Sequence, residues 1–267
     1  MKSILPYLWG KSKIVPKLVE LFPKHVCFVD VFWGSMSVLL WKEKSLSKVE
    51  VYNDLDSEIV NLFQIIWNKN LFEELKQKWE FAIVSRKIFE NLKNSNLDKL
   101  SKVERAFRTL YLYKYAFTSR RNSETSFNYW YRKNANAPDP KNIYWTIKEL
   151  HDRIKNVNFE NLSYDEILKK YDAKDTFFYV DPPYLIPWKN TKYYKHNIDT
   201  EEWQITIKNE IDKIKGKVMI SYPDTDFYRN LYKDYYINTI NIHYSVGTCN
   251  NAQGKQWELI ITNYELI

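Results

Sequence analysis

The sequence predicts an α/β protein with a doubly wound, mostly parallel sheet. Five β-branched or aromatic residues in a row, Thr176–Val180, lack polar alternation and indicate a strand covered on both faces. Two further strands are predicted at Val26–Phe32 and Val49–Asp54, and a helical pattern follows each of them. Strands that alternate with helices favour a parallel sheet, which carries its ligand sites at the carboxyl ends of the strands.

Composition limits the classes of protein that the chain can belong to. The 267 residues are 45% hydrophobic, without an apolar run that approaches the roughly twenty residues of a membrane span. Gly10 and Lys11 interrupt any signal-peptide core, and Cys27 and Cys249 are too few for a disulfide framework. We therefore expect a cytoplasmic protein of one large domain, or of a core with a smaller domain. The net charge of +7 favours a polyanionic partner.

The strand at Thr176–Val180 must end at Asp181, because Pro182 and Pro183 cannot donate hydrogen bonds to a neighbouring strand. A carboxylate, two prolines and the ring of Tyr184 therefore come together at the carboxyl end of a buried strand. A diproline turn with a solvated aspartate is the simpler explanation. The position nevertheless fits a ligand site.

This group of residues suits one particular reaction. The amino group of a nucleobase is a poor nucleophile because its lone pair is conjugated with the ring. Asp181 and the carbonyl of Pro182 could each accept one of its N–H bonds and align the lone pair with an electrophile. Tyr184 could stack on a base that has swung out of its helix.

The first two strands suggest a cofactor cradle. The strand that contains Asp30 and Phe32 leads into a turn with Gly34 and Ser35 and then into a helix. Asp54 ends the second strand, where an acid can hold ribose hydroxyls. Taken alone, Asp54 is better explained as the cap of the helix that follows it.

These segments resemble the Dam-like (D12 class, alpha-type) adenine-N6 DNA methyltransferases, which use S-adenosylmethionine. The catalytic motif Asp-Pro-Pro-Tyr is intact at Asp181–Tyr184. The family opens with an aromatic residue and Gly-Gly-Lys, has a turn close to Phe-Gly-Gly-Ser-Gly-Ser and carries a ribose-binding acid. The corresponding stretches here are Tyr7–Lys11, Phe32–Ser37 and Tyr52–Asp56, and Lys217–Ser221 and Trp257–Tyr264 are also similar to the family.

The resemblance implies a seven-stranded methyltransferase sheet with an inserted, largely helical target-recognition domain. Residues 1–66 and 164–267 would form the methyltransferase core, and 67–163 the insertion. Asp54 would hold the ribose, the turn would border the methionine moiety, and Lys11 would assist the cofactor or the DNA. No metal is expected. The implied cofactor-binding residues are Tyr7, Lys11, Asp30, Phe32, Gly34, Ser35, Asp54 and Asp181.

The cofactor turn departs from the family pattern. Met36 stands where the family has glycine, and Trp33 and Trp9 add bulk. Either the turn is reshaped around a bound cofactor, or the chain is a DNA-binding relative with impaired cofactor binding. Cytosine-N4 transfer would use the same chemistry, whereas cytosine-C5 transfer needs a cysteine after proline, which the chain lacks.

The middle of the chain interleaves basic, aromatic and amide side chains. We expect helices over 68–94 and 101–115, and a loop over 134–140. The mixture suits phosphate contact, base-edge hydrogen bonding and stacking on double-stranded DNA with a flipped adenine, although a small helical core with a wet face would look the same. The candidate DNA-binding residues are Lys114, Arg120, Arg121, Asn122, Tyr129, Arg132 and Lys133. A cognate restriction endonuclease is a further partner of such enzymes.

The remaining segments should complete the sheet. We expect a strand at 161–164, helices at 165–170 and 201–214, and a strand at 217–221. Strands near 236–246 and 257–264 should form an antiparallel pair. The first and fourth strands should be neighbours, which would bring Phe32 and Gly34 close to Asp181.

Overall fold

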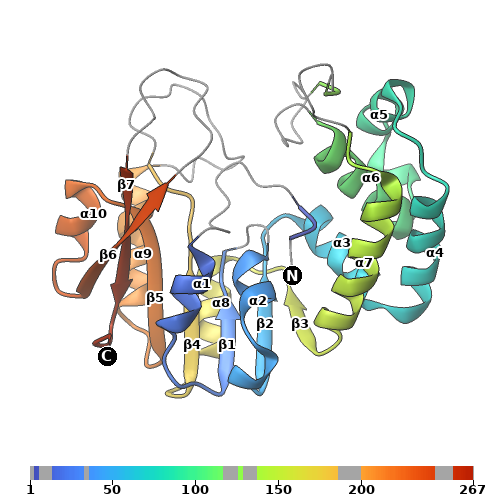
Figure 1. Ribbon diagram of the computed structural model, residues 1–267. Coiled ribbons are helices and arrows are strands. Elements are labelled where there is room, and N and C mark those ends of the chain that lie inside the picture. Colours follow the sequence, from blue (N-terminus) through green and yellow to red (C-terminus); the bar gives the residue numbers. More distant parts are fainter. Residues whose placement is uncertain are drawn as a thin grey trace. The chain divides into compact units, whose positions relative to one another are not determined.

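A computed structural model describes residues 3–5, 14–32, 36–116, 126–128, 137–185, 200–243 and 255–266 (Figure 1). The chain divides into two compact units. The first, called the helical unit, comprises Met1–Gly10, Gly34–Leu40 and Asp54–Asn161. The second, called the sheet unit, comprises Lys11–Trp33, Trp41–Asn53 and Leu162–Ile267.

A seven-stranded sheet has the order β3-β2-β1-β4-β5-β7-β6. β1 runs parallel to β2 and β4, and β4 runs parallel to β5, whereas β7 is antiparallel to both β5 and β6. The predicted mostly parallel sheet, the closing antiparallel pair and the adjacent first and fourth strands are confirmed. The strands are β1 (Cys27–Asp30), β2 (Val49–Asn53), β3 (Val157–Glu160), β4 (Thr176–Val180), β5 (Lys217–Pro223), β6 (Tyr236–His243) and β7 (Lys255–Thr262).

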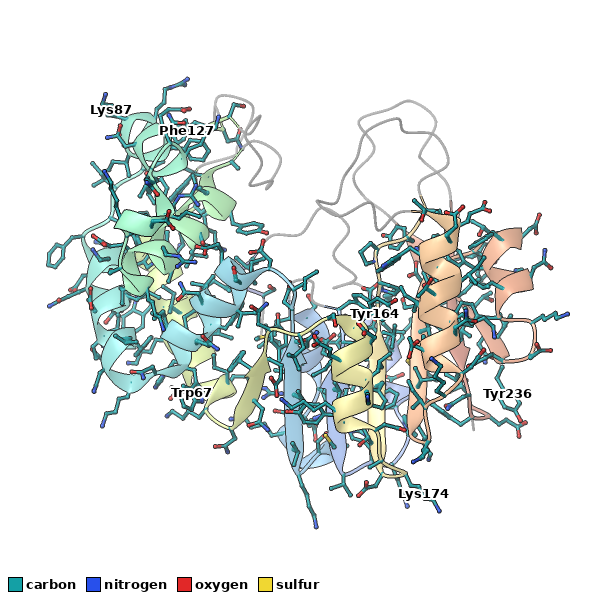
Figure 2. All side chains as sticks on the ribbon, turned by 180° about the vertical axis from the view of Figure 1, so that it is seen from behind. Trp67, Lys87, Phe127, Tyr164, Lys174 and Tyr236 are labelled. Carbon is teal, nitrogen blue, oxygen red and sulfur yellow. The ribbon has the colours of Figure 1, made fainter. Side chains whose placement is uncertain are left out.

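Helices cover both faces of the sheet unit. Seen in Figure 1, α1 lies in front of the strands, while α8 and α9 lie behind them and come to the front in Figure 2. The described helices are α1 (Val15–Glu20), α2 (Ser37–Trp41), α3 (Ser57–Trp67), α4 (Lys69–Glu80), α5 (Arg86–Lys93), α6 (Lys102–Tyr115), α7 (Pro140–Ile154), α8 (Tyr164–Tyr171), α9 (Glu201–Ile211) and α10 (Asp226–Leu231). Among the described residues, none of these helices is long and apolar enough to cross a membrane.

All five residues of β4 are buried, because the strand packs on both faces. Phe178 and Val180 join the apolar cluster that includes side chains of α8 and α9. Phe177 and Tyr179 point the other way, where the ring of Phe22 lies 4.7 Å and 6.3 Å from theirs. Each of these side chains contributes about 1.5–3 kcal/mol by burial. This two-sided packing explains the unbroken apolar run in the sequence.

Two expected elements are placed differently by the structure. The strand expected at 161–164 is wrong, since β3 ends at Glu160 and a capping box formed by Ser163 and Glu166 starts α8 at Tyr164. A capping box satisfies the free N–H groups of a first helical turn, so it ends extended structure. The helix expected over 68–94 is two helices, because Ser85 caps a new one. Helix α7 was not predicted.

Gly216 precedes β5 at a position without room for a side chain. A Cβ atom there would lie 2.7 Å from the carbonyl oxygen of Thr176 and 2.8 Å from that of Ala173. The amide of Gly216 donates to Asp172 Oδ1 at 3.0 Å, which holds the loop against the start of β4. The close approach of two backbone segments therefore requires glycine here.

We expect Gly216→Ala to lower the free energy of unfolding by about 1–3 kcal/mol, because the backbone atoms that the methyl group would meet can move only by distorting β4. Urea denaturation measures the change. Lys215→Ala, at the exposed neighbouring residue, is the control and should stay within about 0.5 kcal/mol of the wild type. Equal stability of the two variants would contradict this reading of Gly216.

Candidate active site

The end of β4 lies beside the end of β1. Asp30 pairs with Tyr179, and the amide of Val31 donates to the carbonyl of Tyr179 at 3.0 Å. This pairing brings the ends of the two strands side by side, and Phe32 and Asp181 each follow one of these strands by one or two residues. That Phe32 lies near Asp181 remains a prediction, and Gly34 lies outside the described residues. The carboxyl edge of the sheet brings together the two strands that carry the candidate cofactor and catalytic residues.

Two further aromatic side chains hold Phe32. Its ring centroid lies 5.9 Å from that of Tyr164 and 5.9 Å from that of Trp203, and the latter two rings are 5.7 Å apart. Figure 2 shows Tyr164 at the upper end of α8, at the opposite edge of the unit from Lys174, which precedes β4. Aromatic pairs of this geometry add about 0.5–1.5 kcal/mol each. Tyr164 and Trp203 were not predicted as part of the site.

Asn53, the last residue of β2, forms hydrogen bonds that connect three segments at the carboxyl edge of the sheet. Its Nδ2 donates to the carbonyl oxygens of Val31 and Leu162, at 3.0 Å each, and its Oδ1 accepts from the amide of Leu162 at 2.9 Å. The buried Asn53 therefore ties β1 and β2 to the segment that enters α8. Asp30, at the end of β1, is also buried, with 4% of its surface exposed.

Asp54 does not cap the helix that follows it. The N-cap residue of α3 is Asp56, whose side chain accepts from the amide of Glu58 at 3.0 Å. Asp54 Oδ1 accepts from the amide of Asp56 at 2.5 Å and so braces the turn before the helix. The interpretation of Asp54 as the cap is wrong by two residues, because the chain makes a turn between β2 and α3.

Met36, which stands where the family pattern has glycine, adopts a backbone conformation that favours glycine. Its φ is 59°, in the left-handed region that a side chain disfavours by roughly 1–2 kcal/mol. The side chain is 1% exposed, so it is packed inside the protein, and the carbonyl of Met36, which precedes α2, accepts from the amide of Leu40 within that helix. Residue 36 thus has a glycine-like backbone conformation although it carries a side chain.

This geometry predicts an unusual order of stability. Met36→Gly and Met36→Ala both delete the buried side chain, but only glycine adopts a positive φ without strain. We expect the glycine variant to be about 1 kcal/mol more stable than the alanine variant. Thermal and urea unfolding of both variants measure this difference. An alanine variant as stable as the glycine variant would show that residue 36 carries no left-handed strain.

Several candidate residues lie outside the described part of the chain: Tyr7, Lys11, Gly34, Ser35, Arg120, Arg121, Asn122, Tyr129, Arg132 and Lys133, with Trp9 and Trp33 of the altered motifs. Lys114 is described and lies in the last turn of α6. It is half-buried, and desolvation lowers its pKa to about 8. Lys114 is therefore a cation whose charge changes near neutral pH.

The sheet and the Asp-Pro-Pro-Tyr motif at its carboxyl edge define the class of methyltransferases that act on amino groups. The sequence model of the D12 class N6 adenine-specific DNA methyltransferase matches residues 7–246. The chain belongs to this family.

Named relatives cover nearly all of the chain. The type II methyltransferase M1.LlaDCHI of Lactococcus lactis subsp. cremoris is 30% identical over 99% of this chain and 96% of its own length. The type II methyltransferase M.MjaIII of Methanocaldococcus jannaschii is 25% identical over 99% of both chains. The modification methylase StsI of Streptococcus sanguinis is 23% identical, and this chain spans 43% of its length.

The chain is therefore an adenine-specific DNA methyltransferase, its substrate is DNA and its cofactor is S-adenosylmethionine. The cytosine-N4 alternative and the alternative of a relative with impaired cofactor binding are not favoured. Residue 36 is compatible with the cofactor, because its side chain is buried and its φ is one that glycine adopts freely. The buried Asp30 and the ring-held Phe32 stand at the edge where such a cofactor is held in doubly wound sheets.

Proposed function

We propose that Asp181 and the backbone carbonyl of Pro182 bind the amino group of the target adenine, while Tyr184 stacks on the flipped base. The observation that carries this proposal is the place of Asp181 at the carboxyl end of β4, beside the end of β1. Tyr184 is partly buried against the apolar cluster of the sheet unit, so its ring has a fixed support. A supported ring is suited to stacking on a base.

The two acceptors act on the lone pair of the amine. When both N–H bonds point at acceptors, the nitrogen becomes pyramidal and its lone pair leaves conjugation with the ring. Bound S-adenosylmethionine supplies the methyl group from its sulfonium. Positive charge develops on the nitrogen during transfer, and the carboxylate of Asp181 stabilises it before the proton is lost. Pro183 limits the movement of this loop because its ring fixes φ.

The remaining cofactor residues take the roles that the family resemblance implies. Asp54 holds the ribose hydroxyls, Phe32 borders the methionine moiety, and Lys11 assists the cofactor or the DNA. Tyr7, Asp30, Gly34 and Ser35 complete the set. The pairing of β1 with β4 supports a place for Phe32 close to the transferred methyl group.

Residues 67–163 form the target-recognition segment in this proposal, and 1–66 with 164–267 form the catalytic core. Lys114 contacts DNA together with Arg120, Arg121, Asn122, Tyr129, Arg132 and Lys133. The relatives are named as type II methyltransferases and modification methylases, which supports a restriction-modification role with a cognate endonuclease in the cytoplasm.

Asp181→Ala should lower the rate of methyl transfer by at least about a thousandfold, because it removes an acceptor that is preorganised for the transition state. The affinity for S-adenosylmethionine should stay within a few-fold. Single-turnover transfer to DNA and calorimetric titration measure the two quantities. Asp175→Ala, the same change at the exposed opposite end of β4, is the control. Near-normal turnover of Asp181→Ala would refute the assignment.

The contribution of Lys114 to DNA binding should depend on pH. With a pKa of about 8, its charged fraction falls from about nine-tenths at pH 7 to about one-tenth at pH 9. The dissociation constant for DNA should therefore rise over this range. In Lys114→Arg the rise should be smaller, because arginine stays charged. Fluorescence anisotropy at constant salt measures it, and identical pH profiles for the two proteins would exclude this role of Lys114.

A further inference from the structure

A buried glutamine holds the backbone of the Asp-Pro-Pro-Tyr loop. Gln204 lies in the second turn of α9 and donates from Nε2 to the carbonyl oxygen of Pro183 at 2.7 Å. Its Oε1 accepts from the hydroxyl of Tyr222 on β5 at 2.6 Å. Both side chains are fully buried. An amphipathic helix rarely buries glutamine, so the side chain must recover by hydrogen bonding what it loses in hydration.

A second tyrosine holds the next peptide unit, on the other side of Tyr184. The hydroxyl of Tyr228, in α10, accepts from the amide of Leu185 at 2.9 Å. The rings of Tyr228 and Tyr222 are stacked, with centroids 3.9 Å apart and planes 13° apart. The carbonyl that precedes Tyr184 and the amide that follows it are thus both bound to one rigid aromatic pair, directly or through Gln204.

The direction of the Gln204 amide follows from the carbonyl of Pro183, which can only accept, and it requires Tyr222 to donate. Burial raises the pKa of Tyr222 well above its usual value, and the negative charge of Asp181 is a smaller cause in the same direction. Tyr222 therefore stays protonated and can donate to Oε1. The NH₂ group of Gln204 must then face Pro183, because two oxygen atoms facing each other would leave a buried acceptor unsatisfied.

We propose that Gln204 and Tyr222 are positioning residues for methyl transfer, an inference that rests on the proposed role of the Asp181–Tyr184 loop. The bond from Gln204 fixes the peptide plane between Pro183 and Tyr184, and so sets the direction of the Tyr184 ring. It also occupies one lone pair of the Pro183 carbonyl, which is consistent with the carbonyl of Pro182 as the acceptor proposed for the target amino group. Misdirection of reacting groups by about 1 Å can cost a hundredfold in rate.

The first test breaks the hydrogen-bonded chain from Tyr222 through Gln204 to Pro183, called the relay, with side chains of similar size. Tyr222→Phe keeps the ring stack but loses the donor, and Gln204→Met keeps the chain length but loses both polar atoms. Each should slow single-turnover methyl transfer at least about tenfold at saturating DNA and S-adenosylmethionine, with cofactor affinity changed less than about twofold. The control is Tyr235→Phe, which loses a 2.7 Å bond to Asp212 beyond the far end of α9 and should transfer at the wild-type rate.

A second variant separates positioning from a merely structural role. In Gln204→Glu a protonated carboxyl can still donate to Pro183 and accept from Tyr222, whereas a carboxylate would face the Pro183 carbonyl with negative charge. Burial, together with the charge of Asp181, should raise the pKa of this glutamate into the neutral range. The ratio of variant to wild-type transfer rate should therefore rise at least about tenfold as the pH falls from about 8.5 to about 6. The same ratio for Gln204→Met should not rise as the pH falls.

The outcomes distinguish this inference from the proposed function. If Asp181→Ala abolishes transfer while Tyr222→Phe and Gln204→Met transfer at the wild-type rate, the relay has no positioning role and the proposed site stands. A ratio of Gln204→Glu to wild-type transfer rate that does not change with pH would also contradict the positioning role. If Asp181→Ala transfers normally, the proposed function itself fails. Loss of cofactor affinity in Gln204→Met, in parallel with its rate, would show a general disturbance of the core and overturn the inference.

Discussion

The abrupt end of β4 is the constraint on which the site depends. The strand is paired on both edges, with β1 and β5, and buried on both faces. At Pro182 and Pro183 the chain loses two amide donors in succession, so strand pairing has to stop there. Asp181 consequently follows directly after a strand whose five residues are all buried. The chain leaves the sheet at the point where the carboxyl edge can receive a ligand.

Buried polar side chains, rather than apolar ones, decide how the segments around this edge are arranged. Asn53 binds the carbonyl of Val31 and both backbone polar groups of Leu162, and Gln204 binds the carbonyl of Pro183. Such bonds are directional, and breaking one leaves an unsatisfied buried group that costs about 1–3 kcal/mol. Apolar packing gives the sheet unit its stability. These side-chain amide groups hold the segments at its carboxyl edge in a single arrangement.

The sequence was informative where local chemistry and the final environment agree. The unbroken apolar run of β4 and the prolines after it predicted both the strand and the position of Asp181. The expected strand at 161–164 does not form, because Ser163 and Glu166 make a capping box, a signal that is visible in the sequence. Helix α7 likewise begins with a capping signal in the sequence, Asp139 followed by Pro140.

Other parts of the site could not be found from the sequence. Gln204 occurs in a helix with many polar residues and looks like a surface side chain, because only the pairing of β4 with β5 and the packing of α9 bury it. Tyr164 and Trp203 meet Phe32 through contacts distant in sequence. The left-handed φ of Met36 was likewise invisible, since methionine does not signal a positive φ.

The most direct test of the account is the identity of the methylated base. Mixed-sequence DNA is incubated with the protein and S-adenosylmethionine, digested to nucleosides and analysed by mass spectrometry. We expect N6-methyldeoxyadenosine in the digest, and its absence when Asp181→Ala replaces the wild type. N4-methyldeoxycytidine in its place, or no methylated nucleoside from the wild-type protein, would contradict it.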